Sequence, residues 1–161
     1  MQRISDALEL LTAQHEEIAA LLSSIAEMDN PVGRNQAITE LADRITVHLA
    51  AEQELLYPAI AANLSRDAHG ELMSEHGEIK RLLADLLWLD HDDPRLPQQL
   101  TAMQILFAKH AGRQENDLFE AVAQTRSVDE LSVLGAEIRG WIDGLVVSDD
   151  AIELSPRAVA A

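Results

Sequence analysis

Apolar residues recur at steps of three and four along most of the chain, a spacing that predicts long helices with one buried face. The first predicted helix, about Arg3 to Met28, places on that face Ile4, Leu8, Leu11, His15, Ile18, Leu22 and Ile25. The second, about Arg34 to Leu64, places there Ile38, Leu41, Ile45, His48, Glu52, Leu55 and Ala59. Each of the first two helices therefore has a histidine at a core position, and the second also has a glutamate.

Three further helices follow the same rule. The third, about Arg66 to Asp90, aligns His69, Leu72, His76, Ile79, Leu83 and Leu86. The fourth, about Pro94 to Gln124, aligns Leu100, Met103, Phe107 and His110. A fifth is expected from about Val128 to Val147, because Ser127 and Glu130 have the spacing of a capping box. Trp88 and Trp141 are expected to supply packing for this fifth helix.

The predicted fold is all-α, an up-down-up-down antiparallel four-helix bundle with an additional C-terminal helix. No run of strictly alternating polarity indicates a strand, and short connections between helices favour antiparallel neighbours. We expect one helical domain over residues 1–147 and a loose C-terminal tail over residues 148–161.

The composition narrows the range of functions. The chain has 12 Lys and Arg against 28 Asp and Glu, so its field repels phosphate backbones and anionic lipids. We therefore expect neither a nucleic-acid nor a membrane partner. No signal peptide or membrane span is recognisable, which predicts a cytoplasmic protein. Because there is no cysteine, any bound metal must have nitrogen and oxygen ligands.

The two halves of the predicted bundle look duplicated. Aligned without gaps, His15 to Ile25 and His76 to Leu86 share five of eleven residues. His15 and His76 are 61 residues apart, and His48 and His110 are 62 residues apart. Each of the four helices is therefore predicted to place a histidine at a similar depth in the core.

Four histidines and a glutamate on the apolar faces favour a metal site. An unpaired buried polar group costs roughly 1 to 3 kcal/mol, so a core of merely hydrogen-bonded histidines becomes expensive. On a helix, His48 and Glu52 differ by about 40° in direction and about 6 Å in height, close enough to share a metal site. Nitrogen and carboxylate ligands suit iron or manganese, and their number fits two ions bridged by carboxylates and a solvent oxygen.

The pattern H…HxxxE…H…H resembles the hemerythrin-like family with the HHE cation-binding domain, and it is formed here by His15, His48, Glu52, His76 and His110. The resemblance covers about Leu8 to Val122. It implies that these residues are ligands of two non-haem iron ions with a bridging oxo, hydroxo or water. Oxygen carriers of the family have a further histidine four residues after the third, where this chain has Lys80. The resemblance therefore gives less support to reversible oxygen carriage than to metal binding.

The last glutamate of the family pattern falls on Gln114. A regular helix points residue 114 toward the metals and residue 115 about 140° away, but a neutral amide is a poor bridge between cations. A single-residue π-bulge, made easier by Gly112, would turn Glu115 inward instead. We predict Glu115 as the second bridging carboxylate. The alternative is a regular helix in which Gln114 is a weak ligand or a hydrogen-bond donor beside the ligands.

Three functions follow from these residues. The first is binding of, or reaction with, O2, H2O2 or NO at a di-iron centre, which would make the protein a di-iron oxidoreductase if it turns over. Lys80 in place of a further histidine favours peroxide or NO chemistry over carriage. The second function is iron buffering or sensing without turnover. The third is a helical interaction module with buried histidines.

Overall fold

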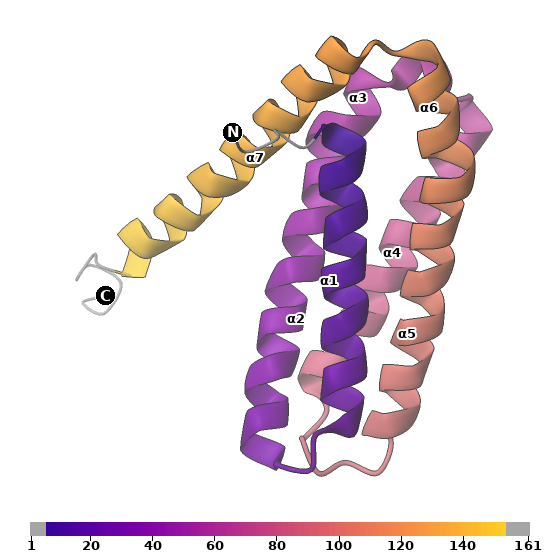
Figure 1. Ribbon diagram of the computed structural model, residues 1–161. Helices are drawn as coiled ribbons and strands as arrows, with labels where there is room; N and C mark the ends of the chain where they lie inside the picture. Colours follow the sequence, from indigo (N-terminus) through magenta and orange to yellow (C-terminus); the bar gives the residue numbers. More distant parts are fainter. Residues whose placement is uncertain (1–5, 154–161) are drawn as a thin grey trace.

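The computed structural model describes residues 6–153 and the side chains of residues 6–145. Figure 1 shows the long helices side by side as an antiparallel bundle, with the last helix running diagonally from one end. The elements are α1 (Ala7–Glu27), α2 (Pro31–Ala51), η1 (Glu52–Leu56), α3 (Tyr57–Ala59), η2 (Ala61–Asn63), α4 (Arg66–Trp88), α5 (Leu96–Arg113), η3 (Gln114–Phe119), α6 (Glu120–Thr125) and α7 (Val128–Glu153). The predicted all-α bundle with a C-terminal helix is confirmed, and the described residues contain no strand.

Side-chain caps start several of these helices. The carboxylate of Asp6 accepts hydrogen bonds from the backbone N–H groups of Leu8 and Glu9, both at 2.9 Å. The predicted capping box of α7 is also present. The N–H of Glu130 donates to the hydroxyl of Ser127 at 3.1 Å, and the N–H of Ser127 donates to the Glu130 carboxylate at 2.8 Å. These bonds satisfy N–H groups that have no partner within the helix.

Two apolar clusters fill the bundle, one on each side of the level of the histidines. The larger fully buried members of the first are Ile18, Leu22, Ile25, Leu41, Ile45, Leu49, Ile79, Leu86 and Phe107. The second contains Leu11, Leu56, Tyr57, Ile60, Leu72, Phe119, Val122, Leu131, Leu134 and Ile138. On α1, His15 stands between Leu11 of the second cluster and Ile18 of the first. The other long helices repeat this order, so a polar layer separates two apolar ones.

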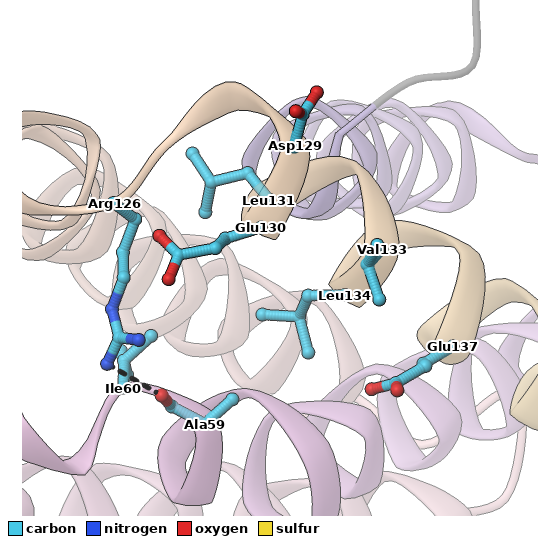
Figure 2. Close-up of a pocket in the computed structure, with 9 residues that line it drawn as sticks. All are labelled: Ala59, Ile60, Arg126, Asp129, Glu130, Leu131, Val133, Leu134 and Glu137. Carbon is cyan, nitrogen blue, oxygen red and sulfur yellow. Dashed lines mark hydrogen bonds between the residues drawn. The ribbon is translucent and has the colours of Figure 1, made fainter.

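α7 covers the second cluster at the end of the bundle where α3 and α6 lie (Figure 1). A cleft of about 390 Å³ remains beside its first turns, where the Arg126 side chain donates to the carbonyl oxygen of Ala59 at 2.9 Å (Figure 2). None of the histidines lines this cleft. No helix in the described part of the chain is both long and apolar enough to cross a membrane.

Some helix ends and one packing prediction differ from expectation. α7 extends to Glu153 instead of Val147, because no glycine or proline lies between Val147 and Pro156. The rest of the predicted tail, residues 154–161, lies outside the described residues. Trp141 packs on the second cluster as expected, but Trp88 is 89 % exposed, so its predicted packing on the fifth helix is wrong. Trp88 ends α4 at the opposite end of the bundle from α3 and α6 (Figure 1).

Candidate metal centre

One buried carboxylate lies at the centre of four histidine rings, one from each long helix. The Nε2 atoms of His48 and His15 lie 3.0 and 3.7 Å from Oε1 of Glu52. The Nε2 atoms of His76 and His110 lie 2.9 and 3.3 Å from Oε2 of the same carboxylate. All five side chains are at most 2 % exposed. The structure thus brings together five of the six residues that the sequence predicts as metal ligands.

Several polar atoms in this layer are buried without a hydrogen-bond partner. They are Nε2 of His15, His48 and His110, Nδ1 of His76, and Oε1 of both Glu52 and Gln114. Each such atom costs roughly 1 to 3 kcal/mol if nothing binds it, and a cation would remove that cost. Ligand atoms of four of these residues lie within 4.8 Å of one another, and these residues are His15, His48, Glu52 and His110. The donor set therefore fits a metal centre with nitrogen and oxygen ligands.

The pKa values of the cluster favour an ionised carboxylate among the rings. Burial raises the pKa of Glu52, but the charge of His48 and the close ring nitrogens of His110 and His15 outweigh it and hold that pKa well below its usual value. Burial lowers the pKa of His48 and so favours the neutral ring that a metal requires. Burial also lowers the pKa of His110, yet Glu52 and Glu75 outweigh it, and the net shift is upward.

Tyr57 is also part of this site, although it does not lie on the apolar stripe predicted from the sequence. Its hydroxyl donates to Oε2 of Glu52 at 3.2 Å and lies 3.0 Å from Nε2 of His76. Burial and the charge of Glu52 raise the pKa of Tyr57, so the phenol stays protonated. A regular helix would point the residue five positions after Glu52 away from the metals. The sequence signal was therefore hidden by an irregular turn.

That turn is a π-turn, and each half of the bundle has one. The N–H of Tyr57 donates to the carbonyl of Glu52, five residues earlier, in η1, and η3 occupies the corresponding place in the second half. Both turns begin four residues after a histidine, at Glu52 and at Gln114. The N–H of Gln114 still donates to the carbonyl of His110, as in a regular helix. The duplication predicted from the sequence thus extends to an irregularity of the backbone.

The structure corrects the placement predicted for Glu115. Because the π-turn starts at Gln114, the turn from His110 stays regular and Gln114 is the residue that points inward, with no exposed surface. Its amide nitrogen donates to the hydroxyl of Tyr57 at 2.8 Å. Glu115 is 35 % exposed and lies behind His15, with its carboxylate 2.8 Å from Nδ1 of that ring. The π-turn adds one residue only after Gln114, so it changes the direction of the side chains that follow. As a result Phe119 is buried and Asp117 is exposed.

Gly112 is not needed for this turn, because η1 forms with Ala50 at the equivalent position. A Cβ atom at Gly112 would have only an ordinary contact, 3.9 Å from the Asn116 side chain. We expect Gly112→Ala to raise the free energy of unfolding by about 0.5 to 1 kcal/mol, since glycine is costly inside a helix. Urea denaturation of the metal-free protein measures this change. A loss of stability would show that the backbone there needs glycine after all.

The outward ring nitrogens of three histidines also have partners. Nδ1 of His48 lies 2.8 Å from the amide oxygen of Gln14. Nδ1 of His110 lies 3.5 Å from Glu75, whose other oxygen accepts a 2.8 Å hydrogen bond from Arg113. Glu115 is the corresponding partner of Nδ1 of His15. Three of the four rings therefore have a hydrogen-bond acceptor on the side that faces away from Glu52. Neither Gln14 nor Glu75 could be identified from the sequence, because each lies beside a histidine of another helix.

Lys80 and His69 do not join the site. Both are exposed, and the ring of His69 lies edge-on to Tyr57 at 6.0 Å from its centre. Position 80, which holds a further histidine in the oxygen carriers that the sequence resembles, therefore supplies no ligand here. The candidate ligands are therefore the residues around Glu52.

Comparisons with known proteins agree with this architecture. A solved structure of a Hemerythrin HHE cation binding domain-containing protein from Mycobacterium kansasii has the same fold, with a TM-score of 0.81, 24 % identity and 96 % of both chains covered. A protein of Nostoc sp. named DNA nickase is 21 % identical over 131 residues, which are 81 % of this chain but 37 % of that protein. The family model Hemerythrin HHE cation binding domain matches residues 6–122, a range that contains Glu52 and the four histidines around it. The chain therefore belongs to the hemerythrin HHE cation-binding domain family.

Proposed function

We propose that the chain binds two iron ions around Glu52 and that the loaded centre binds or reacts with a small oxidant or diatomic ligand: O2, H2O2 or NO. The observation that carries this proposal is a set of buried atoms without partners: Oε1 of Glu52, Oε1 of Gln114, and Nε2 of His15, His48 and His110. Such atoms are stable in a packed core only if a cation satisfies them. The chain has no thiolate, and imidazole with carboxylate oxygen suits iron, with manganese, zinc and copper as competitors.

The two oxygens of Glu52 support two ions instead of one. Oε1 faces the rings of His15 and His48, whereas Oε2 faces those of His76 and His110. Four imidazoles, a carboxylate and the free amide oxygen of Gln114 are also too many for one tetrahedral ion. We expect His15 and His48 to hold one ion, His76 and His110 to hold the other, and Glu52 to contact both.

Burial restricts what the centre can accept. The four rings and Glu52 are at most 2 % exposed, so a substrate of several atoms has no room beside them. Iron bound there would supply electrons and a free coordination position to a small ligand. The chain itself supplies a neutral phenol, Tyr57, held by Gln114 at 2.8 Å and able to donate a hydrogen bond inside the centre. Because position 80 supplies no ligand, the protein would fill fewer coordination positions of the iron, which favours reaction with H2O2 or NO over oxygen carriage.

DNA nicking, named for the Nostoc relative, is not part of this proposal. This chain spans little more than a third of that protein. Its formal net charge of −16 opposes binding to a phosphate backbone. The absence of nucleic-acid and membrane partners and a cytoplasmic location remain predictions from the sequence.

Rapid mixing of the protein loaded with ferrous iron against O2, H2O2 and NO tests this function. We expect at least one of them to change the optical spectrum and the oxidation state of the iron within the mixing experiment. Iron binding without any such change would leave iron buffering or sensing as the function. A sensor should then differ strongly in helicity and protease resistance between its metal-free and loaded forms.

A further inference from the structure

The two halves of the proposed metal centre do not contribute equal negative charge. Glu52 and Gln114 occupy equivalent places, each four residues after a histidine and at the start of a π-turn. Both are fully buried, but only Glu52 is a carboxylate. One negative charge facing two divalent cations leaves an excess of positive charge in a region without solvent. Negative charge close outside the ligands would reduce that excess.

Two carboxylates lie directly behind ligand rings, and they differ in their own partners. Glu75 is 3.5 Å from Nδ1 of His110, a long hydrogen bond, and Arg113 neutralises it through a 2.8 Å ion pair. Glu115 is 2.8 Å from Nδ1 of His15 and has no ion pair with an arginine or lysine among the described residues. Glu115 therefore has both the shorter hydrogen bond and the uncompensated charge.

The hydrogen bond from His15 also decides which nitrogen of the ring faces the metals. A neutral imidazole has one N–H, and a carboxylate behind Nδ1 keeps the proton there. Nε2, which is buried and points at Glu52 from 3.7 Å, is then free to donate its lone pair. Outer carboxylates that orient a ligand histidine in this way also increase its basicity.

We propose that Glu115 is a positioning residue that acts on the iron centre from behind His15. Its carboxylate holds the proton on Nδ1, directs Nε2 toward Glu52, and supplies negative charge that Gln114 does not. This inference rests on the proposed iron binding. Glu115 lines a surface hollow with Glu16 and Phe119, so its side chain can be replaced without disturbing the core.

The test compares three variants in two measurements. Glu115→Ala removes both the hydrogen bond and the charge, and Glu115→Gln keeps an acceptor oxygen without the charge. Glu16→Gln is the control, because Glu16 is exposed in the same hollow and has no hydrogen bond or ion pair with a histidine of the described residues. The first measurement is the rate at which a chelator removes ferrous iron from the loaded protein. The second is the tautomer of His15 in the metal-free protein, from nitrogen and proton NMR of the histidine rings.

We expect Glu115→Ala to release iron about 10- to 100-fold faster than the unmodified protein and the Glu16→Gln control. Glu115→Gln should fall between them. In the metal-free protein, His15 should hold its proton on Nδ1, and Glu115→Ala should lose this preference. The NMR readout does not need iron, so it decides the positioning role even if the protein takes up no iron and the proposed function fails.

Three results would overturn the inference. Equal release rates in Glu115→Ala and the control would show that the carboxylate does not act on the centre. Loss of one iron per chain with an unchanged His15 tautomer would make Glu115 a direct ligand instead. A release rate of Glu115→Gln equal to that of the unmodified protein would show that the charge contributes nothing beyond the hydrogen bond.

Discussion

Glu52→Gln is expected to weaken iron binding by at least about 100-fold, the largest effect of any single substitution in this chain. Replacement of a group one shell outside a metal costs about 10- to 100-fold in affinity, and Glu52 touches all four histidines directly. The amide is nearly the same size, so the change removes the charge and leaves the packing in place. Iron content after loading and desalting, together with a titration against a competing chelator, measures the effect.

Glu54→Gln is the matched control for this substitution. Glu54 lies two residues further along the same π-turn and is exposed, so the variant loses the same charge from the same element. We expect it to bind iron like the unmodified protein. If Glu52→Gln also bound iron with unchanged affinity, Glu52 would not be a ligand, and the histidines would have to hold the metal without it.

Phe107→Ala is expected to lower the free energy of unfolding of the metal-free protein by about 3 to 5 kcal/mol. Phe107 is 1 % exposed, and its ring centre lies 5.8 to 5.9 Å from those of His15, His48 and His110. Phe107 belongs to the first apolar cluster and packs against these three histidine rings. The cavity left by alanine should therefore also loosen the rings and weaken iron binding.

Urea denaturation and iron titration measure the two effects of Phe107→Ala. Ile105→Ala is the control, because Ile105 lies two residues earlier on α5 and is 66 % exposed. Its change in stability should stay within about 0.5 kcal/mol. A loss below about 1 kcal/mol for Phe107→Ala would mean that the bundle collapses around the cavity and that Phe107 does not support the site.

The helices and four inward histidines were predictable because spacing on a helix determines which residues share a face. His15, His48, His76 and His110 each continue an apolar stripe, and the stripe reports the buried face whatever the side chain is. Glu52 was predictable for the same reason, since the turn from His48 to Glu52 is regular: the Glu52 N–H donates to the His48 carbonyl. The family pattern then implied the chemistry of these residues.

The inward residue after His110 was predicted wrongly because a π-turn is decided by tertiary packing. The sequence offered Gly112 as a reason for a bulge before Glu115, but the first half forms its own π-turn without a glycine. In both halves the π-turn begins at the fourth residue after the histidine and buries the ring of Tyr57 or Phe119. A regular helix would point those two rings away from the core. A single sequence does not show whether the free energy gained by burying them exceeds the cost of the π-turn.

The acceptors behind the histidines were missed for a related reason. Gln14, Glu75 and Glu115 each contact a histidine that lies on another helix. Periodicity tells which residues face the core, but it does not tell how far one helix is rotated or shifted against its neighbour. Such contacts need the packed bundle, so only the structure can reveal them.

We propose that cations satisfy the buried nitrogens and oxygens around Glu52. Metal content per chain, determined after anaerobic addition of ferrous iron and removal of unbound metal, tests it most directly. We expect about two iron ions per chain in the unmodified protein and a large loss in Glu52→Gln. A protein that retains no iron under these conditions, yet keeps its helical fold, would contradict it.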